Sequence, residues 1–261
     1  MRMFCMTHRK VSYLNKLKIE LVWVGLKDNP GYMHSHDTGE NIASKNNTFA
    51  ELTGQYWVWK NIMPKMDDNS YLGFCHYRRF FETPEVGKPG KSMYYTADSY
   101  RGTDLHQLEK AFELNNWGVG LHPEVECTLK LKNLPKALIK GLIRAPGKKL
   151  TLIENYQLRH YKNDLLQSID LLPIDIREKF KKHVYQSTSL CPCNMYVAKK
   201  EYLNMYFEIL FPWLFKCEKF IITKNHSDHQ RRVFGFLAER FSSFFLRQHT
   251  SSVSLPVALI A

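Results

Sequence analysis

The chain has 261 residues, of which 44% are hydrophobic, a length and composition that allow one domain with a substantial core. Lysine and arginine number 37 against 25 aspartates and glutamates, and the formal net charge of +12 favours anionic partners, unless the basic surface is merely solvated. No run of 18 apolar residues is present and no apolar signal-peptide core follows Met1, so we expect a cytoplasmic chain without a transmembrane helix, whose six cysteines are free thiols.

Strands and helices alternate along the first half of the chain. Short apolar runs predict strands at residues 3–6, 19–24, 71–75 and 117–121. Residues 48–62 and 105–114 carry apolar side chains at helical spacing and predict helices. Thr48 and Glu51 have the spacing of a capping box, which places the start of the first of these helices at Thr48.

The second half is mostly helical. Residues 126–150 form a basic segment in which Glu126 is the only acid. Beyond it, helices are predicted at 152–169, 174–183, 199–217 and 229–248, with one strand inside 187–198. Strands that alternate with helices and then give way to helices predict an α/β sandwich with a mainly parallel sheet and a helical C-terminal part.

Charged side chains directly follow the predicted strand at 71–75. They are His76, Arg78 and Arg79, with Tyr77 between them. Because ligands of open α/β sheets bind at the carboxyl ends of strands, two arginines here could clamp a diphosphate. The alternative is that an arginine pairs with a nearby carboxylate and that His76 is a satisfied core residue.

Two polar loops are further candidates. The first runs from His36 into the helix predicted at Thr48, and its Asp37 and Asn41 could bind ribose or sugar hydroxyls beside a helix N-terminus, or simply form a turn and cap. The second contains Asn194, which could recognise a hydroxyl group. A zinc site beside Asn194 is disfavoured because no second cysteine pair stands at zinc-finger spacing.

Near the C-terminal end, Asp228 and Glu239 are candidates for a general base that deprotonates a hydroxyl group. Glu239 has an alternative role as a helical residue paired with Arg240 or Arg232. The imidazoles and carboxylate that could in principle bind a divalent metal are His34, His36, His226, Asp228 and His229. No Asp-x-Asp, P-loop or G-x-G-x-x-G motif occurs in the chain.

Taken in order, the motifs resemble those of a bacterial family from capsule, O-antigen and exopolysaccharide gene clusters. This family was long labelled a domain of unknown function and is now placed among glycosyltransferases, some of which use UDP-galactofuranose. The matching segments are Asp37–Ile42, Asn46, Glu51–Thr53, Tyr56–Asn61, Tyr71–Phe80, Glu154–Tyr156, His160, Asp164–Leu165, Cys193–Val197, Lys199–Lys200, Leu210–Pro212 and Arg232–Arg240.

The resemblance implies a single domain, residues 1–261, with a GT-A-like nucleotide-sugar fold. Within this domain we expect a donor-binding half at 1–125, a variable basic segment at 126–150 and an acceptor-side, helical half at 151–261. Our hypothesis is that the donor is held by Thr7, His8, Asp37, Asn41, His76, Arg78 and Arg79, and the acceptor by Asn194 and Tyr77. The expected catalytic residues are Asp228, Glu239 and His76. Many such enzymes hold a divalent metal with Asp-x-Asp; its absence predicts that the arginines replace Mn²⁺ or Mg²⁺, with metal dependence as the alternative.

The expected partners are a nucleotide-sugar donor and a lipid-linked glycan acceptor. Residues Lys130 to Lys149 could dock the chain peripherally on the anionic inner face of the plasma membrane. The rival hypotheses are a nucleic-acid-binding protein, for which no recognisable module is present, and a non-catalytic glycan-binding or scaffold protein of the same fold.

Overall fold

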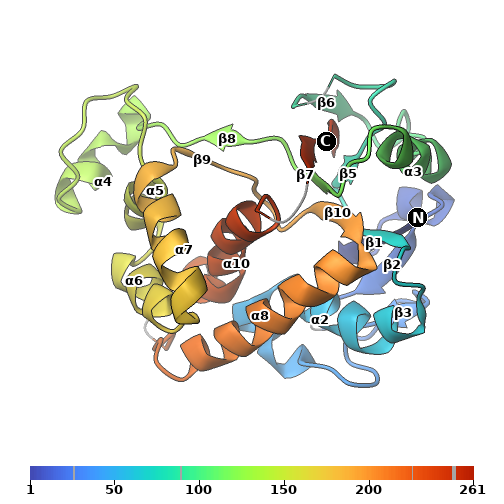
Figure 1. Cartoon of the computed structure of the whole chain (residues 1–261), viewed down its shortest axis with the longest axis horizontal. Coiled ribbons are helices and arrows are strands. Elements are labelled where there is room, and N and C mark those ends of the chain that lie inside the picture. The colour runs from blue at the N-terminus through green and yellow to red at the C-terminus, as the bar shows by residue number, and fades with distance from the viewer. Residues whose placement is uncertain (26, 89, 225, 249–250) are drawn as a thin grey trace.

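The structure is a computed structural model that describes residues 1–261 except 26, 89, 225 and 249–250 (Figure 1). The strands are β1 (Arg2–Thr7), β2 (Glu20–Trp23), β3 (His34–Ser35), β4 (Tyr71–His76), β5 (Arg79–Phe81), β6 (Ser92–Tyr95), β7 (Val119–Leu121), β8 (Val125–Glu126), β9 (Ser189–Leu190), β10 (Tyr196–Lys199), β11 (Ser252–Ser254) and β12 (Val257–Ile260). The α-helices are α1 (Asn46–Phe49), α2 (Leu52–Asn61), α3 (Leu105–Leu114), α4 (Leu134–Ile139), α5 (Leu152–Arg159), α6 (Lys162–Asp170), α7 (Ile174–Gln186), α8 (Lys200–Glu218), α9 (Asp228–Arg231) and α10 (Val233–Phe245). Short 3₁₀ helices lie at Ser12–Lys16, Ala43–Lys45, Met63–Lys65 and Leu131–Asn133.

One large sheet organises the fold, in the order β11-β7-β10-β4-β1-β2-β3. The neighbours β4, β1, β2 and β3 are parallel, with Phe4 opposite Phe74 on one side and Glu20 on the other. Strand β10 runs antiparallel between β4 and β7. The predicted mixed α/β fold with a mainly parallel central sheet and a helical C-terminal part is therefore confirmed.

The two faces of the sheet are buried in different core clusters. Successive side chains of a strand point to opposite faces, so Phe4 and Met6 pack beneath α2, α8 and α10, while Met3 and Cys5 face the side that carries α3 and β12. All six cysteines are unpaired thiols, as predicted. None of the helices in the described part of the chain is long and apolar enough to cross a membrane.

The helix predicted at 48–62 is broken, and the predicted capping box is wrong. Ala50 has a φ of +51°, a left-handed conformation that ends α1 and separates it from α2. The Thr48 hydroxyl donates to the carbonyl of Lys45, and the Glu51 side chain makes no capping bond. Because the Glu51 carboxylate does not cap the helix, it can accept a hydrogen bond from Asn194, far along the chain.

Other helices and strands also differ from the predicted ones. The helix predicted at 152–169 divides into α5 and α6, because His160 takes an extended backbone conformation after a genuine capping box at Thr151 and Glu154. The apolar C-terminal residues pair with the sheet: β11 lies beside β7, and β12 lies between β5 and β6. Figure 1 shows the C-terminus beside these strands.

Candidate functional site

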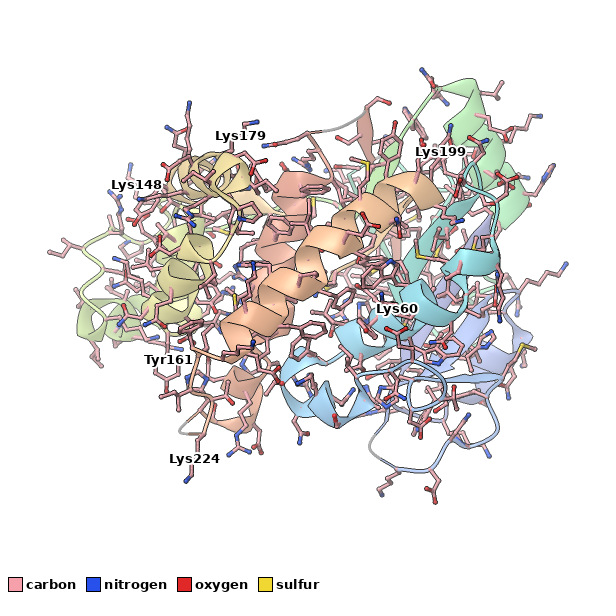
Figure 2. The ribbon with its side chains drawn as sticks, turned by 60° about the horizontal axis from the view of Figure 1, so that its bottom comes forward. Lys60, Lys148, Tyr161, Lys179, Lys199 and Lys224 are labelled. Carbon is pink, nitrogen blue, oxygen red and sulfur yellow. The ribbon has the colours of Figure 1, made fainter. Side chains whose placement is uncertain are left out.

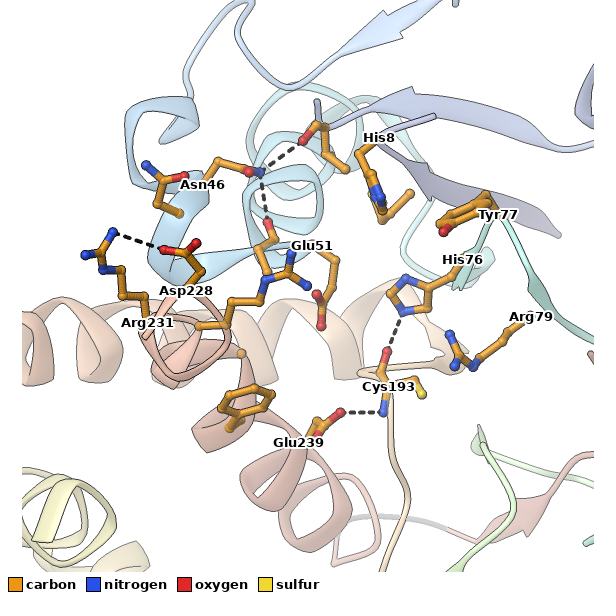
Figure 3. Close-up of a pocket in the computed structure, with 17 residues that line it drawn as sticks. His8, Asn46, Glu51, His76, Tyr77, Arg79, Cys193, Asp228, Arg231 and Glu239 are labelled. Carbon is orange, nitrogen blue, oxygen red and sulfur yellow. Dashed lines mark hydrogen bonds and ion pairs between the residues drawn. The ribbon is translucent and has the colours of Figure 1, made fainter. Parts of the chain in front are cut away.

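A cavity of about 490 Å³ opens where β1 and β4 end (Figure 3). Parallel strands place the residues that follow them at one edge of the sheet, and here these are His8, His76 and Tyr77. The facing wall comes from α1, α9 and the first turns of α10. Its lining residues are Met6, His8, Val24, Asn46, Asn47, Ala50, Glu51, His76, Tyr77, Arg79, Cys193, Asp228, Arg231, Arg232, Gly235, Phe236 and Glu239.

His76 has a defined tautomer. Its Nε2 lies 2.5 Å from the carbonyl oxygen of Cys193, and because a carbonyl only accepts, Nε2 carries the proton. Burial lowers the pKa of His76, and the nearby Arg79 lowers it further against the opposing pull of Glu51. His76 is therefore a neutral imidazole at pH 7 whose Nδ1 is the unprotonated nitrogen.

His8 is the second histidine of the cavity. Its ring meets Tyr77 edge to face, with centroids 5.1 Å apart. Burial lowers the pKa of His8, and the charges of Arg9 and Arg232 add to this effect. Thr7 does not line the cavity: it is buried, and its hydroxyl donates to the carbonyl of Arg9 while accepting from the Arg9 N–H. Thr7 thus shapes the turn that presents His8.

The two adjacent arginines that follow β4 point to different places. Arg79, the first residue of β5, lines the cavity, whereas the Nε of Arg78 donates to the carbonyl of Ile260 in β12 at 3.2 Å. The cavity receives two more arginines from the α9–α10 junction. Arg231 pairs with Asp228 at 3.4 Å. Among the described residues, no carboxylate forms an ion pair with Arg79 or Arg232, so both cations remain available to an anion.

Three carboxylates border the cavity in different settings. Glu51 accepts from the Nδ2 of Asn194 at 2.7 Å. Glu239 accepts from the Cys193 N–H at 2.8 Å and lies 3.3 Å from Arg240, and burial raises its pKa. The side chain of Asp228 is 99% exposed.

The loop that enters β10 links these groups. Cys193 and Asn194 have φ values of +72° and +48°, which turns the Cys193 N–H toward Glu239 and its carbonyl toward His76. Asn194 itself is only 1% exposed and does not line the cavity; its Nδ2 also donates to the carbonyl of Gly235. Burial raises the pKa of the Cys193 thiol to about 12, so this cysteine is not a thiolate.

A second cavity of about 570 Å³ adjoins the first and shares Arg79, Phe236 and Glu239 with it. Its remaining wall comes from the helical half and from the 126–150 segment, through Val125, Glu126, Cys127, Lys136, Asn155, Arg159, His160, Leu190, Pro192, His229, Gln230 and Arg240. His160 stacks on Phe236 with ring centroids 4.0 Å apart. Burial, reinforced by Arg240, lowers the pKa of His160 to about 3, so this ring is neutral.

Asp37 and Asn41 lie outside both cavities, on the exposed loop before α1. The Nδ2 of Asn41 donates to the carbonyl of Gly39, a local turn contact. The same loop reaches the site indirectly, since His36 contacts the Thr53 hydroxyl at 2.7 Å and that hydroxyl also accepts from Asn46.

The histidines considered for a metal site are dispersed. His226 stacks on Tyr161 and lies 3.8 Å from Asp164, while His229 stacks on His160. Within the part of the chain that the structure describes, no group of three histidine, cysteine, aspartate or glutamate side chains is arranged to hold a metal ion. The prediction about metal dependence therefore stays a prediction.

Of the residues predicted for the site, the cavity brings together His8, His76, Tyr77, Arg79, Asp228 and Glu239. Sequence reasoning did not select Asn46, Asn47, Glu51, Arg231 and Arg232 as site residues. Asn46 and Glu51 stand in the segments that carry the family resemblance, which was a usable signal. Arg231 and Arg232 follow the His-Ser-Asp-His stretch, where attention fell on metal ligands.

The fold is that of a glycosyltransferase structure. The chain is similar over its whole length to the apo structure of WbbM, a bifunctional glycosyltransferase, with a TM-score of 0.77 and 21% sequence identity, and it spans 45% of that longer chain. The chain belongs to the family described as a domain of unknown function, DUF4422, which matches residues 2–250. Among curated proteins none matches the sequence.

Proposed function

We propose that the chain is a glycosyltransferase that binds a nucleotide-sugar, with uridine diphosphate as the nucleotide part, in the first cavity and its glycan acceptor in the second. One observation carries this proposal: Glu239 lines both cavities, together with Arg79 and Phe236. A transferase needs one point where its two substrates meet, and a binding protein does not. Volumes of about 490 and 570 Å³ lie in the range of small-molecule sites.

Arg79 and Arg232 would hold the diphosphate of the donor. Both line the first cavity and neither is neutralised by a described carboxylate. The leaving nucleotide diphosphate gains negative charge in the transition state, and fixed guanidinium groups stabilise that charge. The neutral imidazole of His8 and the ring of Tyr77 offer hydrogen bonds and an aromatic surface for the remainder of the donor.

Glu239 is the better placed of the two predicted bases. Its raised pKa brings its basicity nearer to neutrality, whereas Asp228 is exposed and paired with Arg231. In the reaction, Glu239 takes the proton of the acceptor hydroxyl as that oxygen bonds to the anomeric carbon. The bond from this carbon to the diphosphate breaks, and its electron pair leaves with the nucleotide. His76 positions the site through its bond to Cys193, whose N–H holds Glu239.

The resemblance to the polysaccharide family supports a finer version of the proposal. The donor would be a UDP-sugar, with UDP-galactofuranose as the first candidate, and the acceptor a lipid-linked glycan of capsule, O-antigen or exopolysaccharide synthesis in the cytoplasm. The second cavity, rich in cations and with the stacked rings of His160 and Phe236, has the chemistry to bind a sugar near a phosphate group.

A thermal-shift screen against UDP, GDP, CMP and their sugars, with and without Mn²⁺, tests donor binding. A ligand at 100 times its Kd stabilises the native state by about 2.7 kcal/mol, which such a screen resolves. We expect a shift with UDP that needs no metal. A thermal shift that appears only with Mn²⁺ would support a glycosyltransferase but refute metal-independent donor binding. No shift with any nucleotide would favour a non-catalytic scaffold protein.

Turnover tests the base. With UDP-galactofuranose and a synthetic diphospholipid-linked acceptor, we expect Glu239→Gln to lower kcat by about 10²–10⁴-fold, the usual contribution of a positioned base. Asp228→Asn is the matched control and should change kcat by less than about tenfold. Equal losses in the two variants, with UDP binding intact, would assign the base elsewhere.

A further inference from the structure

The 126–150 segment carries an unusual set of exposed aliphatic side chains. Leu131, Leu138, Ile139 and Ile143 are 72%, 59%, 87% and 89% exposed. All four lie within 13 residues of one another along the chain. Grouped exposed apolar side chains usually mark a contact surface rather than chance exposure.

These side chains are not a by-product of a poorly packed segment. Leu129, Ala137, Leu142 and Leu150 anchor the same stretch in the main core. The backbone closes on itself through the bonds from Leu129 N–H to the Lys148 carbonyl and from Leu150 N–H to the Cys127 carbonyl. The segment is therefore held to the core by one set of apolar side chains, and the four exposed aliphatic side chains are not part of that set.

A turn at the end of α4 separates the two sets. Gly141 has a φ of +69°, which ends the helix and lets the Leu142 N–H bond to the Ala137 carbonyl. Leu142 thereby enters the core, while Ile139 and Ile143 on either side of the turn remain in solvent. We refer to Leu138, Ile139 and Ile143, which precede and follow this turn, as the tip of the segment.

The segment that carries this tip is basic. Residues 126–150 contain seven lysines and arginines and one acid. Arg144 pairs with Glu154, and Lys149 pairs with Glu126. Among the described residues, no carboxylate pairs with Lys130, Lys132, Lys136 or Lys148. Figure 1 shows α4 at one edge of the molecule, and Figure 2 shows Lys148 at the edge opposite Lys199.

We propose that the tip of the 126–150 segment inserts Leu138, Ile139 and Ile143 into the interface of an anionic lipid bilayer while the lysines of the same segment contact its headgroups. Apolar insertion together with basic residues is the combination that binds peripheral proteins to acidic membranes. Charge alone predicted an electrostatic contact; the exposed aliphatics add an apolar anchor that salt does not screen. Lys136 of α4 also lines the second cavity, so the anchored face borders the proposed acceptor site.

Vesicle co-sedimentation of the full chain tests this proposal without any donor or glycan, so its outcome is separate from that of the nucleotide screen. We expect binding to phosphatidylglycerol-containing vesicles and little binding to pure phosphatidylcholine. The double variant Ile139→Ser/Ile143→Ser should bind the anionic vesicles at least tenfold more weakly, which corresponds to about 1.4 kcal/mol. The control Leu114→Ser/Ile222→Ser removes two aliphatics that are 75% and 76% exposed elsewhere and should bind as the parent chain does.

Three results would overturn the proposal. Equal binding of the Ile139→Ser/Ile143→Ser variant would show that the tip does not insert. Equal binding to both kinds of vesicle would remove the role of the lysines. In the third result, the unmodified protein does not bind vesicles but is a dimer in light scattering, and the double variant is a monomer. This would show that the tip contacts a second copy of the chain.

Discussion

Replacing Asn194 by alanine should destabilise the protein strongly, although Asn194 does not touch the cavity. Its Nδ2 donates to the Glu51 carboxylate at 2.7 Å and to the Gly235 carbonyl at 3.1 Å. A hydrogen bond to a charged group contributes about 1.5–3 kcal/mol, and one to a neutral group about 0.5–1.5 kcal/mol. The φ of +48° adds roughly 1–2 kcal/mol for a residue with a Cβ that lacks asparagine's local hydrogen bonding.

The free energy of unfolding of Asn194→Ala should therefore fall by about 3–6 kcal/mol. For a chain of this size, about 1 kcal/mol shifts Tm by roughly 2–4 °C, so Tm should fall by about 6 °C or more. Urea unfolding followed by circular dichroism measures the change. Asn194→Gly is the matched variant: it loses the same hydrogen bonds but tolerates positive φ, and should recover about 1 kcal/mol.

A loss below about 1 kcal/mol in Asn194→Ala would refute the two hydrogen bonds as stabilising contacts. Equal stability of the alanine and glycine variants would refute the contribution of the left-handed backbone. Both results can be read without an activity assay, which separates the structural role of Asn194 from any effect on turnover through Glu51.

Three further predictions concern the site, a buried acid and the packing of α2. Arg79→Ala should weaken UDP binding at least tenfold by isothermal calorimetry, a loss of about 1.4 kcal/mol, whereas Arg78→Ala should not, and the reverse order would contradict the assignment. Burial raises the pKa of Glu82 from 4.5 to about 7, so the folded protein binds this proton more tightly than the unfolded chain and its stability falls as pH rises from about 4.5 to 7. The stability of Glu82→Gln minus that of the unmodified protein, measured by urea unfolding, should therefore be more favourable at pH 8 than at pH 5. The same stability difference at both pH values would contradict the raised pKa of Glu82. A Cβ on Gly54 would lie 2.3 Å from the Met6 sulfur, so Gly54→Ala should lower stability by about 1–3 kcal/mol in the same assay, and an unchanged midpoint would show that α2 shifts freely on the sheet.

Much of the fold follows from local patterns. The helix predicted at 105–114 is α3 residue for residue, and the strands predicted around Met3 and Tyr71 are β1 and β4. The failures lie where distant segments decide the local conformation. The break between α1 and α2 requires a positive φ at Ala50, and the sequence around this alanine does not predict it. Strands β11 and β12 form by pairing with β7 and with β5 and β6, which are distant in the sequence.

Only part of the candidate site could likewise be predicted from the sequence. The position of His76 and Arg79 follows from the rule that polar residues after a parallel strand meet at the edge of the sheet. The prediction for Arg78 did not allow for the two-residue turn at Tyr77 and Arg78 between β4 and β5, from which Arg78 donates to Ile260 of β12. Arg232 reaches the cavity because the helix predicted at 229–248 begins again at Val233, a break with no glycine or proline to mark it.

The pairing of β12 has a consequence for how the protein is made. Arg79 sits on β5, a strand that pairs with β4 at one position and otherwise with β12, some 180 residues further along the chain. A ribosome that has synthesised the whole N-terminal half has therefore not yet produced a strand that holds this arginine in place. A chain released before residue 257 would carry the histidines of the cavity but would lack β12, the strand that pairs with β5 and with it Arg79.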